Sequence, residues 1–120
     1  MKRLYALRGA TQCVNTVNDI CEKVVVMYDE LLSANNLAED EIVSVIFSVT
    51  ADLTAANPCA ALRKGGRAGE LALFSAQEPE SGASLERTIR TLVHCYLDEG
   101  SKSRHVYRNG AEVLRPDRCL

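Results

Sequence analysis

The sequence predicts an α+β domain in which a mixed β-sheet packs against two long helices. Three observations support this fold class. Apolar positions in residues 14–32 recur at helical spacing, residues 42–49 form an apolar, β-branched run typical of a buried strand, and strand-like and helical segments alternate along the chain. A chain of 120 residues, with 47% hydrophobic and 25% charged residues, has the size and composition of one globular domain, residues 1–120.

The first strand and helix are predicted from a change of period. Residues 4–10 read as a strand that ends in small and polar residues. A long helix follows, because its apolar side chains form a single stripe that ends at Leu32. Thr16 with Asp19 resembles a capping box at its start, and Asn35-Asn36 is a suitable end.

The middle of the chain predicts two strands and a short helix. Residues 42–49 show no alternation of apolar and polar residues, so we expect a strand covered on both faces. Pro58 suits the first turn of a short helix through Arg63, and residues 70–76 predict a further strand.

The last third predicts the second long helix and a hairpin. Ser84 can cap a helix whose apolar positions, at helical spacing, are Leu85, Ile89, Leu92, Val93 and Tyr96. Residues 104–107 and 111–115 flank Asn109-Gly110, a dipeptide that favours the tight turn of a β-hairpin.

Composition and charge argue against several classes of protein. The net charge of −2 indicates no basic surface for nucleic acid, and no apolar run is long enough to span a membrane. The N-terminus lacks the apolar core of a signal peptide, so we expect a cytoplasmic protein. The five cysteines, an odd number without a Cys-x-x-Cys pair, indicate free thiols rather than disulfides or a metal site.

Several polar residues lie near the ends of the predicted elements, where binding residues tend to collect. They are Arg8 after the first strand, the segment Ser75-Ala76-Gln77-Glu78 after the third, Arg90 on the second helix but off its apolar stripe, and Tyr107 and Arg115 on the hairpin. Each residue alone could be an ordinary surface group. Together, three arginines, one tyrosine and one carboxylate would suit a small dianion that carries a hydroxyl group.

Four short segments carry a resemblance to a known family: Leu7-Arg8-Gly9-Ala10-Thr11, residues 49–54, Arg104-His105-Val106-Tyr107, and Val113-Leu114-Arg115-Pro116-Asp117. They resemble the monofunctional, trimeric chorismate mutases, which have a mixed α/β pseudo-barrel fold. Gln77-Glu78 and Ile89-Arg90 fall between them at the family's spacing. The resemblance spans nearly the whole chain.

The resemblance implies catalytic roles for Arg8, Glu78 and Arg90. Arg8 and Tyr107 would hold the enolpyruvyl carboxylate of chorismate. Arg90 would reach both that carboxylate and the ether oxygen, and Glu78 would accept the ring hydroxyl. Ser75 stands where the family usually has Cys, and its hydroxyl could donate to Glu78.

The resemblance also implies how the pocket is completed. Phe74, Ser75, Ala76 and Gln77 would line it, and Leu114 would also contact the substrate. Arg115 would lie at the rim, near the ring carboxylate. Arg63 would come from a neighbouring subunit and lie at the same rim, near the ring carboxylate, so that a homotrimer has three sites at its interfaces. Asn57 stands where an aromatic residue is usual, and Ala60 where a lysine is usual.

The function expected from the resemblance is the Claisen rearrangement of chorismate to prephenate, in phenylalanine and tyrosine biosynthesis. It would need no metal and no cofactor, and no nucleic-acid or membrane partner is expected. Two alternatives stay open. One is a non-catalytic trimeric module of the same fold that binds an aromatic-pathway metabolite. The other is the trimeric enamine/imine deaminase family, whose site lacks the pairing of Glu78 with Arg90.

Overall fold

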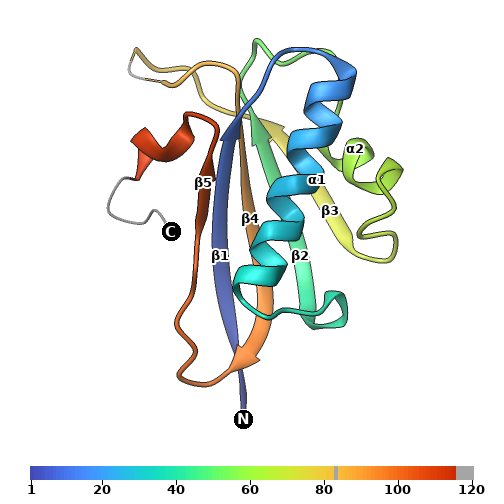
Figure 1. Ribbon diagram of the computed structural model, residues 1–120, viewed down its shortest axis with the longest axis vertical. Helices are drawn as coiled ribbons and strands as arrows, with labels where there is room; N and C mark the ends of the chain where they lie inside the picture. The colour runs from blue at the N-terminus through green and yellow to red at the C-terminus, as the bar shows by residue number, and fades with distance from the viewer. Residues whose placement is uncertain (83, 116–120) are drawn as a thin grey trace.

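The structure, a computed structural model, describes residues 1–82 and 84–115. Its main elements, shown in Figure 1, are β1 (Lys2–Gln12), α1 (Val17–Ala34), β2 (Ile42–Val49), α2 (Pro58–Lys64), β3 (Ala72–Gln77), β4 (Thr88–Asp98) and β5 (Val106–Arg108). Two 3₁₀ turns, η1 (Glu39–Glu41) and η2 (Ala111–Leu114), follow α1 and β5.

The strands form one mixed sheet in the order β3-β2-β4-β1-β5. β4 runs antiparallel to β1 and β2, whereas β3 and β5 pair in parallel with β2 and β1. α1 lies across one face of the sheet and α2 packs beside it, and we call the opposite face the open face (Figure 1). The predicted α+β architecture with a mixed sheet is therefore confirmed.

The core lies between the sheet and the two helices. Side chains on a strand alternate between its faces, so the buried Leu7, Phe47 and Val93 face α1 while their sequence neighbours face the open side. Gly9 lets α1 approach β1 closely. A Cβ atom at Gly9 would lie 3.0 Å from Thr91 Cγ2 and 3.1 Å from Leu31 Cδ1.

The predicted helix ends of α1 and the predicted start of α2 are confirmed. The Thr16 hydroxyl accepts a hydrogen bond from the Asp19 N–H at 3.1 Å, and Asn35 caps the C-terminus of α1. Pro58 begins α2, and the Asn57 side chain accepts hydrogen bonds from two N–H groups of its first turn. Thr16 and Asn57 thus satisfy backbone donors at the helix starts, and Asn35 donates to the Leu31 carbonyl, an acceptor at the end of α1, at 2.8 Å.

The prediction of a second long helix, with apolar positions from Leu85 to Tyr96, is wrong, because residues 88–98 form the strand β4. Ile89, Val93 and Cys95 are buried against α1, at positions that alternate as in a strand. The open face also carries the apolar residues Leu92 and Tyr96, so apolar character itself does not alternate, and the spacing imitates a helix. Arg90 therefore lies on a central strand rather than on a helix.

The predicted hairpin around Asn109-Gly110 is also wrong. Both residues have the positive φ that such a turn needs, 56° and 104°. The chain before the turn, however, pairs in parallel with β1, and the chain after it forms η2. The Asn109 side chain donates to Thr11 Oγ1 at 2.9 Å, so the turn is held against β1 instead of closing a two-stranded ribbon.

Two further expectations are corrected or limited by the structure. β2 was expected to be covered on both faces, but Val45 and Phe47 are buried while Ser44, Ile46 and Ser48 are partly exposed on the open face. Of the cysteines, Cys13, Cys21, Cys59 and Cys95 are free thiols, and Cys119 lies outside the described residues.

In the described part of the chain, no helix has the length and apolar character needed to span a bilayer.

Candidate active site

A cavity of about 370 Å³ opens on the open face, beside the β4-β1-β5 part of the sheet. Its lining brings together five of the predicted site residues, which come from three strands and the C-terminal turn: Arg8, Arg90, Tyr107, Leu114 and Arg115. Ala10, Ile46 and Ser48 also line it. Residues far apart in the sequence therefore meet in one pocket.

Strand register explains this convergence. Ser48 pairs with Arg90, Arg90 with Ala10, and Ala10 with Tyr107. Side chains of paired residues project from the same face, so these four residues form one row across the open face. Arg8 lies two positions from Ala10 on β1 and therefore on the same face. The small side chain of Ala10 leaves space between the two guanidinium groups and the tyrosine.

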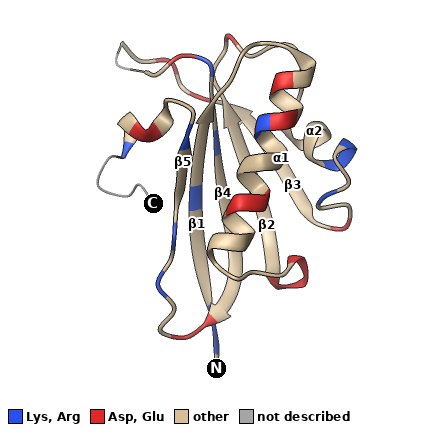
Figure 2. Ribbon diagram, viewed as in Figure 1, with Lys and Arg blue, Asp and Glu red and all other residues tan. Residues whose placement is uncertain are grey.

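Basic and acidic residues are distributed differently over the molecule. Figure 2 shows basic positions along β1, β4 and β5, while acidic positions gather chiefly on α1, in the loops and in the 3₁₀ turns. Among the described residues, the pocket lining includes Arg8, Arg90 and Arg115 and no carboxylate. Since three guanidinium groups face this cavity, its charge favours an anion.

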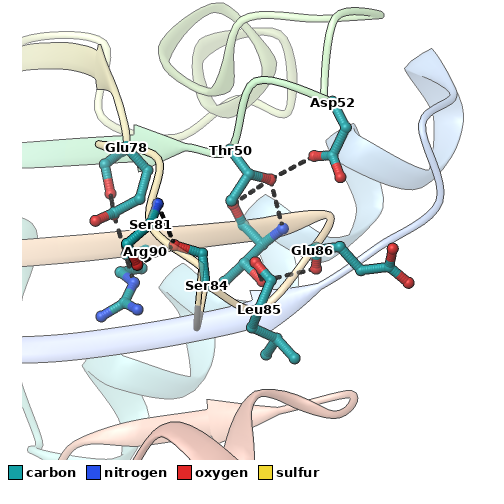
Figure 3. A network of polar contacts seen from close by, with 10 residues as sticks. Thr50, Asp52, Glu78, Ser81, Ser84, Leu85, Glu86 and Arg90 are labelled. Carbon is teal, nitrogen blue, oxygen red and sulfur yellow. Dashed lines mark hydrogen bonds and ion pairs between the residues drawn. The ribbon is translucent and has the colours of Figure 1, made fainter.

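Glu78 borders the pocket from the end of β3. Its N–H donates to the Val49 carbonyl at 2.7 Å, which extends the β2–β3 ladder by one residue. One of its carboxylate oxygens lies 3.4 Å from Arg90 Nε and accepts a hydrogen bond from the Ser48 hydroxyl at 2.6 Å. Figure 3 shows Glu78 beside Arg90. A carboxylate and a guanidinium are thus held at adjacent positions of the site.

Ser48 is a site residue that the sequence reasoning missed. The expected donor to Glu78 was Ser75, but Ser75 Oγ instead accepts a hydrogen bond from Asn57 Nδ2 at 3.2 Å, on the helical side of the sheet. Phe47, the strand partner of Ser75, is buried on that side. Ser44 and Ser48 are four residues apart in an otherwise apolar strand, so both lie on the same face. This spacing is a sequence signal that one face of the strand is partly polar.

The remaining predicted residues lie outside the pocket lining of a single chain. Phe74 and Ala76 are on the open face of β3, where Phe74 is 64% exposed, and Gln77 ends that strand. Arg63 is exposed on α2, which packs on the helical face. A single chain therefore does not bring Arg63 to its own pocket.

A second cavity, of about 510 Å³, lies next to the first, and Glu78 is on its wall. Besides Glu78, its lining includes the carboxylates of Asp52, Glu80 and Glu86, but no Lys or Arg among the described residues. This charge disfavours a dianion, although the cavity is the larger one. We therefore assign anion binding to the cavity that Arg8 and Arg90 line.

A polar network holds the start of β4, the strand that carries Arg90. The Thr50 hydroxyl donates to Asp52 at 2.5 Å (Figure 3) and accepts from the Thr88 N–H at 2.9 Å. Asp52 also accepts from the Arg87 N–H. The Thr50 hydroxyl, with the Arg87 N–H, holds the pKa of Asp52 below its usual value. Thr88 is two residues before Arg90, so this network anchors the strand that carries Arg90.

The described residues include no group of three or more His, Cys, Asp or Glu side chains that could hold a metal ion. Two cysteines are also poor nucleophiles, because burial raises the pKa of both the Cys13 and Cys95 thiols to about 11. These thiols stay protonated near neutral pH.

Comparison with known proteins identifies the family. The family model "Chorismate mutase type I" matches residues 4–118. "Chorismate mutase AroH" of Thermus thermophilus is 41% identical over 90 residues, 73% of each chain, and that of Bacillus subtilis (strain 168) is 28% identical over 119 residues, 98% of this chain and 94% of the other. The solved structure of a chorismate mutase from Clostridium thermocellum superposes with a TM-score of 0.85 at 40% identity, covering 91% of this chain and 98% of that one. The chain therefore belongs to the type I chorismate mutase family.

Proposed function

We propose that this chorismate mutase binds chorismate in the pocket lined by Arg8, Arg90 and Tyr107 and rearranges it there to prephenate. One observation carries the proposal: two strand arginines and a tyrosine converge on a single cavity, and the carboxylate of Glu78 lies beside one of those arginines. Chorismate is a dianion with a ring hydroxyl. The cationic pocket suits its carboxylates, and the neighbouring Glu78 suits the hydroxyl.

Arg90 has the central role in this proposal. In the rearrangement, breaking of the ether bond runs ahead of carbon–carbon bond formation, so negative charge builds on the ether oxygen. A fixed guanidinium beside that oxygen stabilises the transition state more than the substrate. The neighbouring Glu78 and the anchored start of β4 hold Arg90 in place before the substrate reacts.

Arg8 and Tyr107 would clamp the enolpyruvyl carboxylate. They lie on adjacent strands, and Ala10 between them leaves room for the side chain of the substrate. Holding that carboxylate restrains a flexible substrate in its compact reactive shape, which lowers the entropic part of the barrier. Glu78 would accept the ring hydroxyl, and Arg115 at the rim would face the ring carboxylate. No proton has to move, so the reaction needs neither a metal nor a cofactor.

A homotrimer would complete each site. Arg63 lies on the helical face of its own chain, so it can serve a pocket only across an interface. The open face also exposes large apolar side chains: Leu4 is 50%, Tyr96 46% and Phe74 64% exposed. Burying such side chains favours association, and a second and third copy of the chain would cover them. In the cell, the enzyme would act in the cytoplasm and supply prephenate for phenylalanine and tyrosine synthesis.

The direct experiment is to follow the loss of chorismate absorbance with purified protein, with and without a chelator, while light scattering gives the mass of the active species. We expect activity that the chelator leaves unchanged and a mass of three chains. An inactive, folded protein that still binds chorismate would support the metabolite-binding alternative. A stable and fully active monomer would contradict the trimeric site.

A further inference from the structure

We propose that His105 is a positioning residue that sets Arg8 and Tyr107 relative to each other. The inference rests on the proposed function, since it concerns how the pocket holds a carboxylate. The His105 side chain itself lies outside the pocket lining. The Arg8 N–H donates a hydrogen bond to His105 Nδ1 at 2.9 Å, and His105 is only 8% exposed.

This hydrogen bond stands where strand pairing begins. β5 pairs with β1 at Gly9–Val106, Ala10–Tyr107 and Thr11–Arg108. Arg8 and His105 are the residues just before the first of these pairs. The imidazole nitrogen therefore takes the place that a backbone carbonyl would have if the ladder continued by one residue.

β4, the other strand next to β1, does not accept a hydrogen bond from the Arg8 N–H. Opposite residues in an antiparallel ladder alternate between pairs that exchange two hydrogen bonds and pairs that exchange none. Arg8 is opposite Leu92 on β4, but its N–H is directed to His105 on the β5 side. The Arg8–Leu92 pair is therefore one that exchanges none, and the ring of His105 supplies the acceptor.

The backbone that presents the imidazole is itself held from α1. Asn35, which caps α1, accepts from the Arg104 N–H at 2.9 Å and donates to the Arg104 carbonyl at 2.9 Å. A side-chain amide thus grips both backbone groups of the residue before His105. Asn35 at the end of α1 therefore positions the His105 ring, and the ring in turn positions the start of β5.

The geometry also specifies the tautomer. An imidazole nitrogen accepts a hydrogen bond only when it carries no hydrogen, so His105 must be neutral with its hydrogen on Nε2. Tyr107 is two residues further along the chain and lines the pocket with Arg8. Losing the acceptor would let β5 shift along β1, and the two groups proposed to clamp one carboxylate would no longer match it.

This role predicts a particular kinetic effect. The carboxylate is charged in both the substrate and the transition state, so a loosened clamp raises KM. It also restrains the substrate less firmly in its reactive shape, so kcat falls as well. We expect H105A to raise KM for chorismate about tenfold or more. H105N should restore it, because Asn Oδ1 lies as many bonds from the backbone as His Nδ1 and always accepts. H94N is the matched control at the other histidine, which lies on β4, contacts Ser44 of β2 and does not line the pocket.

Amide hydrogen exchange and NMR test the same bond without catalysis. The Arg8 amide should exchange faster in H105A than in wild type and stay protected in H105N, and the ¹⁵N shift of His105 Nδ1 should be that of a nitrogen without hydrogen. If H105A does not fold, H105Q replaces it, because glutamine keeps an amide but displaces the acceptor by one bond. Unchanged KM and Arg8 exchange in H105A or H105Q would overturn the inference. A wild-type protein without mutase activity would instead overturn the proposed function.

Discussion

Replacing Arg90 with alanine separates catalysis from stability. The side chain is 45% exposed, and its ion pair with Glu78 is 3.4 Å long. Such partly exposed pairs contribute about 0 to 1 kcal/mol to the free energy of unfolding. A donor directed at charge that develops in the transition state contributes about 3 to 4 kcal/mol, or roughly 100- to 1,000-fold in turnover. We therefore expect R90A to fold nearly as well as wild type while its kcat collapses.

The assay is the initial rate of chorismate loss, measured alongside thermal unfolding. R90K should recover only part of kcat, because an ammonium group cannot fork between the ether oxygen and a carboxylate. K2A is the matched control, since it also removes ion pairs, to Glu41 and Asp98, but at the far end of β1. If R90A folds, binds chorismate and keeps wild-type turnover, both the mechanism and the assignment of Arg90 are wrong.

The remaining predictions concern a rim contact, packing and acid stability. R63A should raise KM and leave kcat largely intact, because the ring carboxylate that Arg63 would contact is charged in both the substrate and the transition state; a large fall in kcat in steady-state kinetics would contradict this. G9A should lower the free energy of unfolding by about 1 kcal/mol in urea titrations, because the added methyl would press on Thr91 and Leu31; an unchanged midpoint would show that α1 moves aside freely. Asp52 has a lowered pKa in the fold, so its carboxylate stabilises the fold above about pH 4 and this stabilisation is lost as the pH falls through the folded pKa. D52N should therefore lose less stability than wild type between about pH 5 and pH 3, and parallel unfolding curves would refute this.

The sequence determined the elements whose signals are local. α1 carries a full amphipathic stripe with Thr16 and Asn35 at its ends, and Pro58 marks the start of α2, so both helices could be placed from caps and periodicity. The family resemblance depended on short segments such as those around Arg8 and Tyr107, with Arg90 at the family's spacing between them, and it needed no correct secondary structure. Arg90 was for this reason named as a site residue although its segment was expected to be a helix.

Tertiary structure decided what depends on partners distant in sequence. Residues 88–98 form a strand because they pair with β1 on one side and β2 on the other, a placement that apolar spacing does not encode when both faces carry apolar residues. The positive φ angles of Asn109 and Gly110 specify a change of direction, but Thr11 and Ala10 decide where the chain goes next.

The same limit applies to the site. Ser48, and not Ser75, reaches Glu78 because register places Ser48 opposite Arg90 on the open face, while Ser75 faces α2. His105 contacts Arg8 across 97 residues of chain. The sequence alone determined which residue types the pocket would use. Their faces, partners and protonated nitrogens depend on strand register, which is set by non-local hydrogen bonds that a local pattern does not contain.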